Sequence, residues 1–381
     1  MEFLSGVGAG IGGYVVPFLL LLTALVFVHE MGHYVIARAC GVRVEVFSIG
    51  FGPEVFGITD SHGTRWKFSL VPLGGYVKMF GDRDVASTPD ELSPTMTAED
   101  RKVAFPAKSV GRRAAIVAAG PVANFLFAIV VFAALFATVG EPYTPPEVVA
   151  VRPDSAAAAA GIRAGDRILS INGRSVDRFE DIRQIVQIGL GAPLDMLIAR
   201  GGETVRLDVT PAVVEQADSL GNTFPIGRLG IDGPGYAYIR HDPATAVWRG
   251  MRASWSQVEI AMKAIHQMII GTRTTKEIGG PLRIGWLSGE IAEGGVLTLV
   301  TFMAILSVNL GLINLFPIPI LDGGHLLFYV AEALRGRPLS MKAQEYGSRI
   351  GLALVLVLFV FATWNDLVHL RVVQFIQGLI T

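Results

Sequence analysis

Two histidines and a glutamate lie close together in an apolar stretch of the chain, VFVHEMGHYVIA. His29 and His33 are four residues apart, and Glu30 directly follows the first of them. On a helix, residues four apart share one face about one turn apart, so both imidazoles can reach the same metal ion. Zinc is commonly bound in this way, and an adjacent carboxylate can act as a base on water at the open coordination position. The spacing therefore predicts a helix that carries a zinc centre.

The residues around the motif favour metal binding over a structural role. Both flanks are apolar enough to lie in a bilayer, where polar side chains are costly and mark functional sites. The alternative is a pair of interfacial or helix-capping histidines near the membrane surface. The glutamate between the histidines fits the metal site better than this alternative.

A catalytic zinc usually takes a third protein ligand and leaves its fourth position to water. The candidate is Asp322 in the segment NLFPIPILDGGH. Pro317 and Pro319 interrupt an apolar helix just before it, and a broken backbone at membrane depth is tolerated where it lines a polar cavity. His325 is the rival ligand, although it could instead support the other ligands or lie at the interface.

The composition predicts a polytopic α-helical membrane protein that carries a soluble module. The 381 residues are 51% hydrophobic and only 17% charged, which is too apolar for an ordinary soluble protein. The net charge of −1 gives no indication of nucleic-acid binding, and the lone Cys40 excludes an intramolecular disulfide. Apolar windows of about 20 residues predict four spans: Tyr14 to Ala37, Ala114 to Val139, Val296 to Ile320 and Ile350 to His369.

The distribution of Lys and Arg predicts the orientation of these spans, because cytoplasmic loops retain positive charge. Basic residues concentrate in 38–113 and 326–349 and are nearly absent from both ends of the chain. Both termini and the long 140–290 region are therefore expected outside the cytoplasm. The amino terminus lacks a basic region and a small-residue cleavage site, so we expect the first span to be retained.

Between the first two spans, the segment VRVEVFSIGFGPEVFGITDSHGTRWKFSLVPLGGYVKMFGD alternates apolar residues with Gly and Pro punctuation. This pattern is typical of β-hairpins. An open sheet edge cannot face lipid, so we expect a β element that packs on the helices around His29. Its edge could pair with an unwound substrate, or the hairpin could be purely structural.

Residues 141–235 are predicted to form a soluble α+β domain that resembles a PDZ domain of the protease-associated type. The resemblance lies in GIRAGDRILSINGRSV and in the order of strands and helices around it. It implies that Leu229, Gly230 and Ile231 form a carboxylate-binding loop, placed at the end of the domain as in circularly permuted members. Such a loop binds peptide C-termini beside a helix, here Phe179 to Ile188. The alternative is an ordinary turn.

Pro243 to Gly271 is predicted to be an amphipathic helix that lies on membrane lipid or packs on a neighbour. The segment GGPLRIGWLSGEIAEGG after it is expected to be a flexible lead into the third span. The chain is therefore predicted to have four parts. Residues 1–140 contain two spans, the β element and HExxH, and residues 141–235 form the PDZ-like domain. Residues 236–295 contain the amphipathic helix and its linker, and residues 296–381 contain the last two spans with the LDG motif.

Together, HEMGH, AGPVANF, NLFPIPILDGG and the inserted PDZ-like domain resemble the site-2 protease family of intramembrane metalloproteases, and most closely its bacterial RseP branch. The resemblance implies a zinc ion bound by His29, His33 and Asp322, with Glu30 as the general base. It implies that Asn314 and the helix broken at Pro317 and Pro319 help to hold the substrate. Gly120 and Asn124 match the family's motif in the second span, where a small residue permits close helix approach and a polar one can hydrogen-bond inward.

The resemblance further implies a zinc endopeptidase of the bacterial inner membrane that cleaves transmembrane segments of single-span proteins. Anti-sigma factors already clipped outside the membrane and remnant signal peptides are the substrates it suggests. The chain departs from the best-known relatives in one respect, because it has a single PDZ-like domain and they have two in tandem. The role proposed for the pair, to filter substrates by size, is therefore open for this chain. A non-catalytic scaffold and a zinc or proton-coupled transporter are the alternatives. Neither requires a glutamate beside the ligands or a broken third helix.

Overall fold

A computed structural model describes residues 2–82, 96–188, 190–217, 223–235, 237–271 and 279–369 of the chain. It divides into two compact units. The first comprises Met1–Ala134 and Val247–Thr381, and the second is Leu135–Ala246. The predicted PDZ-like domain falls within the second unit.

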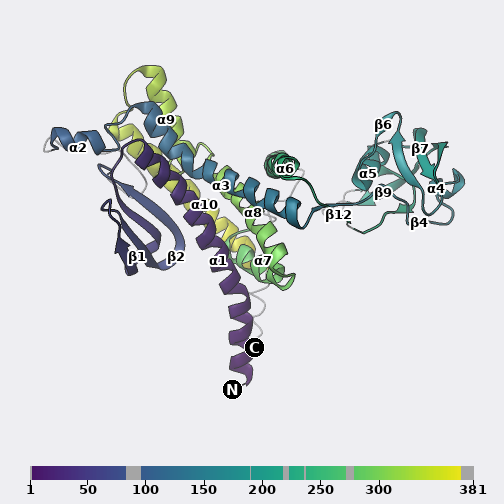
Figure 1. Ribbon diagram of the computed structural model, residues 1–381, viewed down its shortest axis with the longest axis horizontal. Coiled ribbons are helices and arrows are strands. Elements are labelled where there is room, and N and C mark those ends of the chain that lie inside the picture. The colour runs from purple at the N-terminus through teal and green to yellow at the C-terminus, as the bar shows by residue number, and fades with distance from the viewer. Residues whose placement is uncertain are drawn as a thin grey trace. The chain divides into compact units, whose positions relative to one another are not determined.

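Four helices in the described part of the chain are long and apolar enough to cross a membrane, and each overlaps a predicted span. They are α1 (Glu2–Ala39), α3 (Val110–Thr138), α8 (Val296–Asn314) and α10 (Met341–His369) (Figure 1). The apolar window of α3 is 44% buried, whereas those of the other three are only 17–22% buried. Their apolar side chains therefore face mostly outward, as expected for helices in lipid.

The third span is shorter than predicted, because α8 ends at Asn314 and residues 315–321 are irregular. Two prolines in this segment lack the N–H that a continuing helix would need. A new helix, α9 (Asp322–Arg335), follows, where the sequence predicted a loop from residue 326 onward. It ends at Gly336, whose φ of 69° is a left-handed conformation that glycine adopts without strain.

The prediction of a flexible segment before the third span is wrong, because this segment contains the helix α7 (Pro281–Glu293). Pro281 occupies the first helical position, where its missing N–H costs nothing. The Asp366 carboxylate on α10 accepts hydrogen bonds from the backbone N–H groups of Gly280 and Arg283, at 2.8 and 3.0 Å. A side chain distant in sequence thus caps the start of α7.

The predicted β element is present as the antiparallel pair β1 (Val44–Thr59) and β2 (Arg65–Met79). It packs on α1 through an aromatic cluster in which Phe47, 1% exposed, stacks on Trp66 and meets Tyr34 edge-on. Asp60 in the connecting turn accepts hydrogen bonds from Trp66 Nε1 and Tyr34 Oη. These contacts fix the hairpin beside the half of α1 that carries HExxH.

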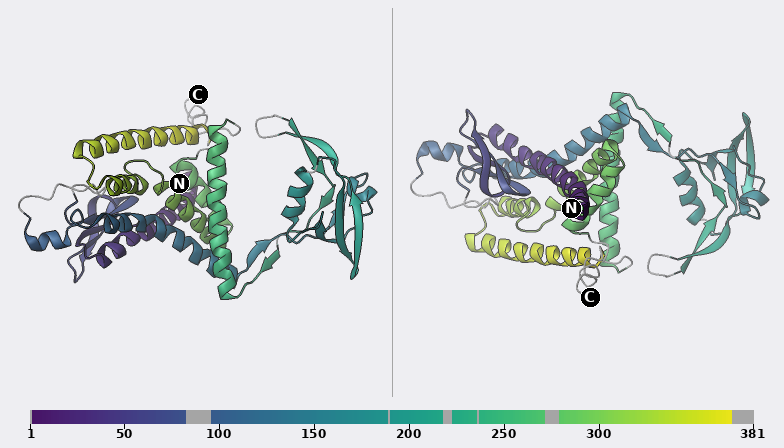
Figure 2. Two further views of the ribbon diagram at one scale, coloured as in Figure 1. Left: turned by 90° about the horizontal axis from the view of Figure 1, so that it is seen from above. Right: turned by 90° about the horizontal axis from the view of Figure 1, so that it is seen from below.

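Two further helices belong to the first unit wholly or in large part: α2 (Ala98–Val103) and α6 (Pro243–Ile269). Figure 2 shows α6 running across the direction of α10. The residue Ser254 on α6 is buried, whereas Trp248, Met251 and Trp255 are exposed. The amphipathic pattern of α6 thus leaves much of its apolar surface outside the packed helices.

The second unit contains a four-stranded sheet in the order β6-β5-β7-β8 and three two-stranded pairs, β4 with β11, β9 with β10 and β3 with β12. The helix α5 (Phe179–Ile188) covers this sheet, with Ile182, Ile168 and Met196 in the shared core. The remaining elements are β3 (Glu141–Tyr143), β4 (Ala150–Val151), α4 (Ala156–Ala159), β5 (Arg167–Ile171), β6 (Arg174–Ser175), β7 (Leu194–Arg200), β8 (Glu203–Val209), β9 (Ala212–Ala217), β10 (Thr223–Arg228), β11 (Ile231–Asp232) and β12 (Ala237–Ile239).

Candidate metal centre

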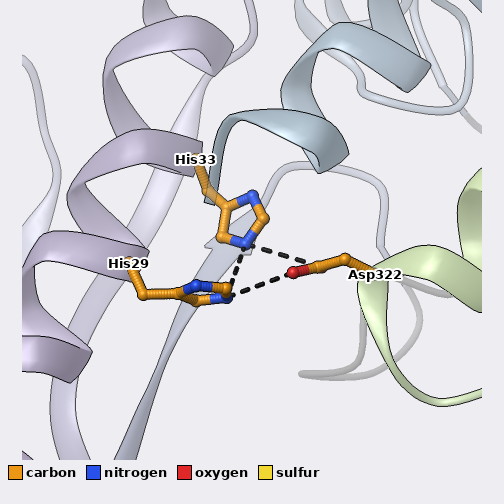
Figure 3. A group of neighbouring side chains, drawn as sticks. All are labelled: His29, His33 and Asp322. Carbon is orange, nitrogen blue, oxygen red and sulfur yellow. Dashed lines mark hydrogen bonds and ion pairs between the residues drawn. The ribbon is translucent and has the colours of Figure 1, made fainter. Parts of the chain in front are cut away.

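Three side chains from two helices converge on one point (Figure 3). His29 and His33 project from α1, and their Nε2 atoms lie 3.3 Å apart. Asp322, the first residue of α9, places Oδ2 at 3.1 Å from His29 Nε2 and Oδ1 at 3.6 Å from His33 Nε2. Two imidazole nitrogens and a carboxylate oxygen, all within 4.8 Å of one another, form a donor set for a single cation.

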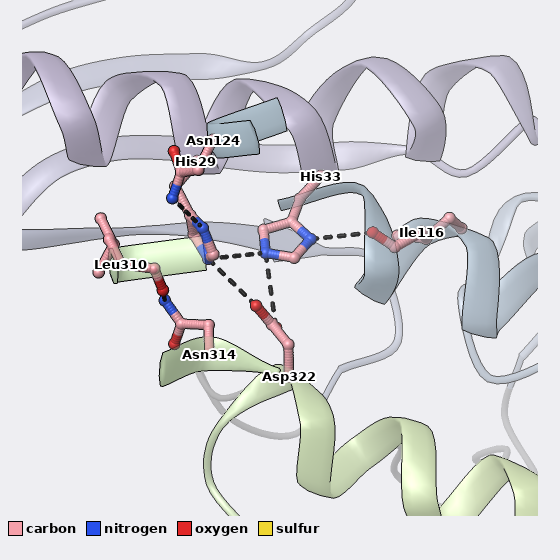
Figure 4. Close-up of polar contacts among 7 residues, drawn as sticks. All are labelled: His29, His33, Ile116, Asn124, Leu310, Asn314 and Asp322. Atoms are coloured by element: carbon pink, nitrogen blue, oxygen red, sulfur yellow. Dashed lines mark hydrogen bonds and ion pairs between the residues drawn. The ribbon is translucent and has the colours of Figure 1, made fainter. Parts of the chain in front are cut away.

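The backbone of α3 orients His33. Its Nδ1 lies 2.9 Å from the carbonyl oxygen of Ile116, and a carbonyl can only accept (Figure 4). The proton of the imidazole is therefore on Nδ1, and the lone pair on Nε2 points towards His29 and Asp322. A backbone acceptor behind a metal-binding histidine is the usual arrangement that fixes its tautomer.

Glycines make the room that this arrangement needs. A Cβ added at Gly120 would lie 2.3 Å from His33 Nε2 and 2.9 Å from His29 Cε1, so only glycine leaves the imidazole nitrogens open on that side. A Cβ at Gly32 would lie 2.2 Å from the Ala119 carbonyl oxygen. Both glycines let α1 and α3 approach closely, which is the use of small residues at helix contacts in membranes.

The position of Asp322 depends on the break before it and on the two glycines after it. A Cβ at Gly323 would lie 2.3 Å from the carbonyl oxygens of Leu315 and Phe316, and one at Gly324 would lie 2.4 Å from that of Ile318. The first turn of α9 can therefore sit directly on the 315–321 segment. Glycine is required here for close approach, because neither residue has a positive φ.

Glu30 lies beside the donor set and is only 9% exposed. The backbone of Val77 in β2 lies close to its carboxylate. A Cβ at Gly75 would lie 3.2 Å from Glu30 Cγ, so β2 passes close to this side chain. The β element thus borders the carboxylate that the sequence predicts as the base.

The residues fit a zinc ion. Two histidines and one carboxylate are a common set of protein ligands for catalytic zinc, which leaves a fourth position open. Because residue 120 is glycine, no side chain at this position covers the imidazole nitrogens. His325, the rival ligand of the sequence analysis, is buried on the next turn of α9 and is not a member of the donor group found among the described residues.

Three residues predicted to hold the substrate lie around the break. Asn314 is the last residue of α8, and its Nδ2 donates to the Leu310 carbonyl at 3.1 Å (Figure 4). Pro317 and Pro319 lie in the 315–321 segment. A Cβ at Gly351 would overlap the Pro319 carbonyl oxygen, so α10 passes directly over this segment. All three come shortly before Asp322 in the chain. Among the described residues, no hydrogen bond joins them to His29 or His33.

The predicted carboxylate-binding loop lies in the second unit, on the rim of a groove of about 670 Å³. Leu229, Gly230 and Ile231 form one wall with the neighbouring strands, and Phe179, Ile182, Arg183, Val186 and Gln187 of α5 form another. The carbonyls of Leu229 and Gly230 accept from the N–H groups of Ala157 and Arg152. In the part of the chain that the structure describes, the N–H groups of Leu229 and Gly230 make no hydrogen bond.

Other residues of this groove were missed by the sequence analysis. Arg152, Arg228 and Asp232 line it near the loop, and Val214, Glu215 and Ile226 of the β9–β10 pair extend it. Arg152 is paired with Asp232, whereas no ion pair is found for Arg228 among the described residues. The sequence contained one signal for this residue, an arginine directly before the predicted loop.

The chain is similar over nearly its whole length to known metalloproteases. The sequence model of peptidase family M50 matches residues 17–358. A relative from Rhizobium meliloti (strain 1021), with the provisional name zinc metalloprotease R01501, is 48% identical over 93% of this chain and 96% of its own. Metalloprotease MmpA from Caulobacter vibrioides is 37% identical over 96% of this chain and 98% of its own.

Two solved PDZ-domain structures are similar to part of the chain. The PDZ domain of an SdrC-like protein from Listeria monocytogenes is 22% identical, with a TM-score of 0.19 over 24% of this chain and 88% of its own. The PDZ domain of HtrA3 bound to a phage-derived ligand is 18% identical, with a TM-score of 0.15 over 19% of this chain and 88% of its own.

Proposed function

The chain belongs to peptidase family M50 and is a zinc metalloprotease, and on that premise we propose that it cleaves transmembrane segments of single-span proteins within the membrane. The observation that carries this proposal is the convergence of His29, His33 and Asp322 next to Glu30. The two histidines and the glutamate lie on a helix apolar enough to cross a membrane. A hydrolytic site at that depth acts on bonds that are themselves in the membrane.

His29, His33 and Asp322 would hold the zinc ion, which when bound supplies a Lewis acid that activates water and polarises a peptide carbonyl. Glu30 is the general base, which accepts the proton of the attacking water and delivers it to the leaving amine. The Val77 backbone lies close to the Glu30 carboxylate, so β2 borders the base. Ile116 keeps the proton of His33 on Nδ1, away from the reacting atoms.

The substrate must unwind locally, because the peptide bonds of a helix are shielded by their own hydrogen bonds. We expect β2 to accept the unwound segment as an added strand, because it borders Glu30 at Gly75 and Val77. Asn314 and the segment with Pro317 and Pro319 would contact the substrate on the side of Asp322. Anti-sigma factor-like proteins and remnant signal peptides are the proposed substrate classes.

The proposed location is the bacterial inner membrane, with both termini and the PDZ-like domain outside the cytoplasm. Support comes from the Lys and Arg residues concentrated in 38–113 and 326–349. We place α6 on the lipid surface, because Trp248 and Trp255 are 62% and 64% exposed and the helix runs across α10 (Figure 2). Tryptophan is the residue that favours this interface.

The PDZ-like domain is proposed to bind peptide C-termini in the groove between α5 and the loop Leu229-Gly230-Ile231. The unbonded N–H groups of Leu229 and Gly230 suit a carboxylate. The apolar side chains of Ile182 and Val186 suit an apolar terminal residue. The substrate of the protease, clipped outside the membrane, would present such a terminus.

The test compares wild-type enzyme with Glu30→Gln on a purified single-span substrate in detergent. Glu30→Gln should keep its zinc content and its fold but lose cleavage, because the base is removed and the ligands remain. Glu293→Gln, an identical change at an exposed position of α7, should cleave normally. Turnover by Glu30→Gln at the wild-type rate would refute the assignment.

A further inference from the structure

Asn124 contacts a metal ligand from the opposite helix. Its side chain on α3 is fully buried, and its Nδ2 lies 3.2 Å from His29 Nδ1 (Figure 4). Its Oδ1 is also buried, and it has no hydrogen-bond partner among the described residues. A buried polar atom without a hydrogen-bond partner destabilises the folded protein, so an amide with one unpaired end directly behind a candidate ligand indicates a role.

The orientation of this amide fits only one of the two tautomers of His29. With the NH₂ group donating to Nδ1, His29 carries its own proton on Nε2, which faces Asp322 Oδ2 at 3.1 Å. A histidine that binds zinc through Nε2 must instead carry its proton on Nδ1 and needs an acceptor behind it. A half-turn of the Asn124 amide about its last side-chain bond would supply Oδ1 as that acceptor.

We infer that Asn124 is a positioning residue whose amide donates to His29 Nδ1 without zinc and accepts from it when zinc is bound. His33 has no such freedom, because the Ile116 carbonyl behind it can only accept. A carboxamide is the side chain that can satisfy both tautomers of His29. The inference rests on zinc binding by His29 and not on the identity of the substrate.

The structural contacts of Asn124 can be separated from this role. The Ser307 hydroxyl on α8 donates to the backbone carbonyl of Asn124 at 2.9 Å, and Gly311 packs against its Cβ. Neither contact involves the amide. Substitutions that change only the end of the side chain therefore leave the packing of α3 on α8 in place.

The experiment measures zinc affinity by competition with a chelator, using purified full-length protein in detergent. Asn124→Leu has a similar size and no acceptor, and should bind zinc about 10–100-fold more weakly. Asn124→Asp keeps an acceptor and should bind at least as tightly as wild type. Ser307→Ala, which removes only the packing hydrogen bond, should bind as wild type.

Two further measurements distinguish loss of the proposed role of Asn124 from a failure of the variant to fold. The thermal midpoint of each metal-free variant shows whether it folds, and Asn124→Ala replaces Asn124→Leu if the latter does not. The visible spectrum of the cobalt-substituted protein should change in Asn124→Leu and be close to wild type in Asn124→Asp. Equal loss of affinity in the Asp and Leu variants, or wild-type affinity in both, would overturn the inference without affecting the proposed protease activity.

Discussion

Asp322 Oδ2 lies 3.1 Å from His29 Nε2, so the first residue of α9 meets the face of α1 that carries HExxH. This contact exists only because α8 stops at Asn314 and the chain restarts as a helix at Asp322. The broken helix is therefore part of the candidate metal centre. Whatever moves the start of α9 should alter metal binding even when both histidines are intact.

Asp322→Asn should lower zinc occupancy and cleavage together, because a neutral amide is a much weaker zinc ligand than a carboxylate. His325→Ala should leave occupancy unchanged, because His325 lies outside the donor group. Metal analysis of both purified proteins checks this. Loss of zinc in His325→Ala with retention in Asp322→Asn would reverse the assignment of the third ligand.

Gly120→Ala should weaken zinc binding by about tenfold or more, since the added methyl would lie 2.3 Å from His33 Nε2 and must displace the imidazole. Gly111→Ala is the matched control on the same helix, because its added methyl would meet no atom within 4 Å. Chelator competition measures both. Equal affinities in the two variants would show that α3 can move away from His33 at little cost.

The sequence predicted the parts of this site that depend on local periodicity. The four-residue spacing of His29 and His33 fixes their common face on any helix, so no tertiary information was needed. Asp322 was predicted from its position after two prolines, and the structure places it with both histidines. Its role as the third ligand stays a prediction until metal binding is measured.

What the sequence did not predict depends on contacts between distant segments. The helix α7 was expected to be flexible, because the cap that starts it comes from Asp366 on α10. The partners of the ligands were missed for a similar reason. Ile116 contributes a backbone carbonyl to His33, which no side-chain motif can reveal.

The second unit should lose stability in acid through one buried ion pair. Asp166 is 1% exposed and accepts two hydrogen bonds from Arg200, at 2.7 and 2.8 Å, and one from the Arg163 backbone. Burial alone would raise the pKa of the Asp166 carboxyl, but these hydrogen bonds outweigh it and the pKa lies below its ordinary value. The unfolded chain then binds the proton more tightly than the folded one.

The stabilisation by Asp166 is therefore complete above the unfolded pKa of about 3.9 and is lost as the pH falls through the lower folded pKa. Asp166→Asn should lower the free energy of unfolding by about 1.5–3 kcal/mol at neutral pH, because hydrogen bonds to a charged group are lost, and should flatten this acid dependence. Hydrogen exchange of the β5 and β7 amides between pH 3 and pH 7 measures it. Asp154→Asn, at an exposed position, should behave as wild type.

Arg228 should strengthen the binding of a peptide C-terminus in the groove of the second unit. It is exposed, has no ion-pair partner in the described chain, and directly precedes Leu229 and Gly230, whose N–H groups make no hydrogen bond. A free carboxylate at this loop would gain charge-assisted contacts that an amidated terminus cannot make. Arg228→Glu should thus weaken binding of a fluorescent peptide ending in valine by about tenfold or more.

The matched control is Arg174→Glu, the same charge reversal at an exposed strand position that does not line the groove. It should bind the peptide as wild type does, and the amidated form of the peptide should bind weakly to all three proteins. Fluorescence anisotropy with full-length protein in detergent distinguishes the cases. If the amidated and free peptides bind wild type equally well, the groove recognises an internal segment of its ligand, and the loop Leu229-Gly230-Ile231 does not bind a carboxylate.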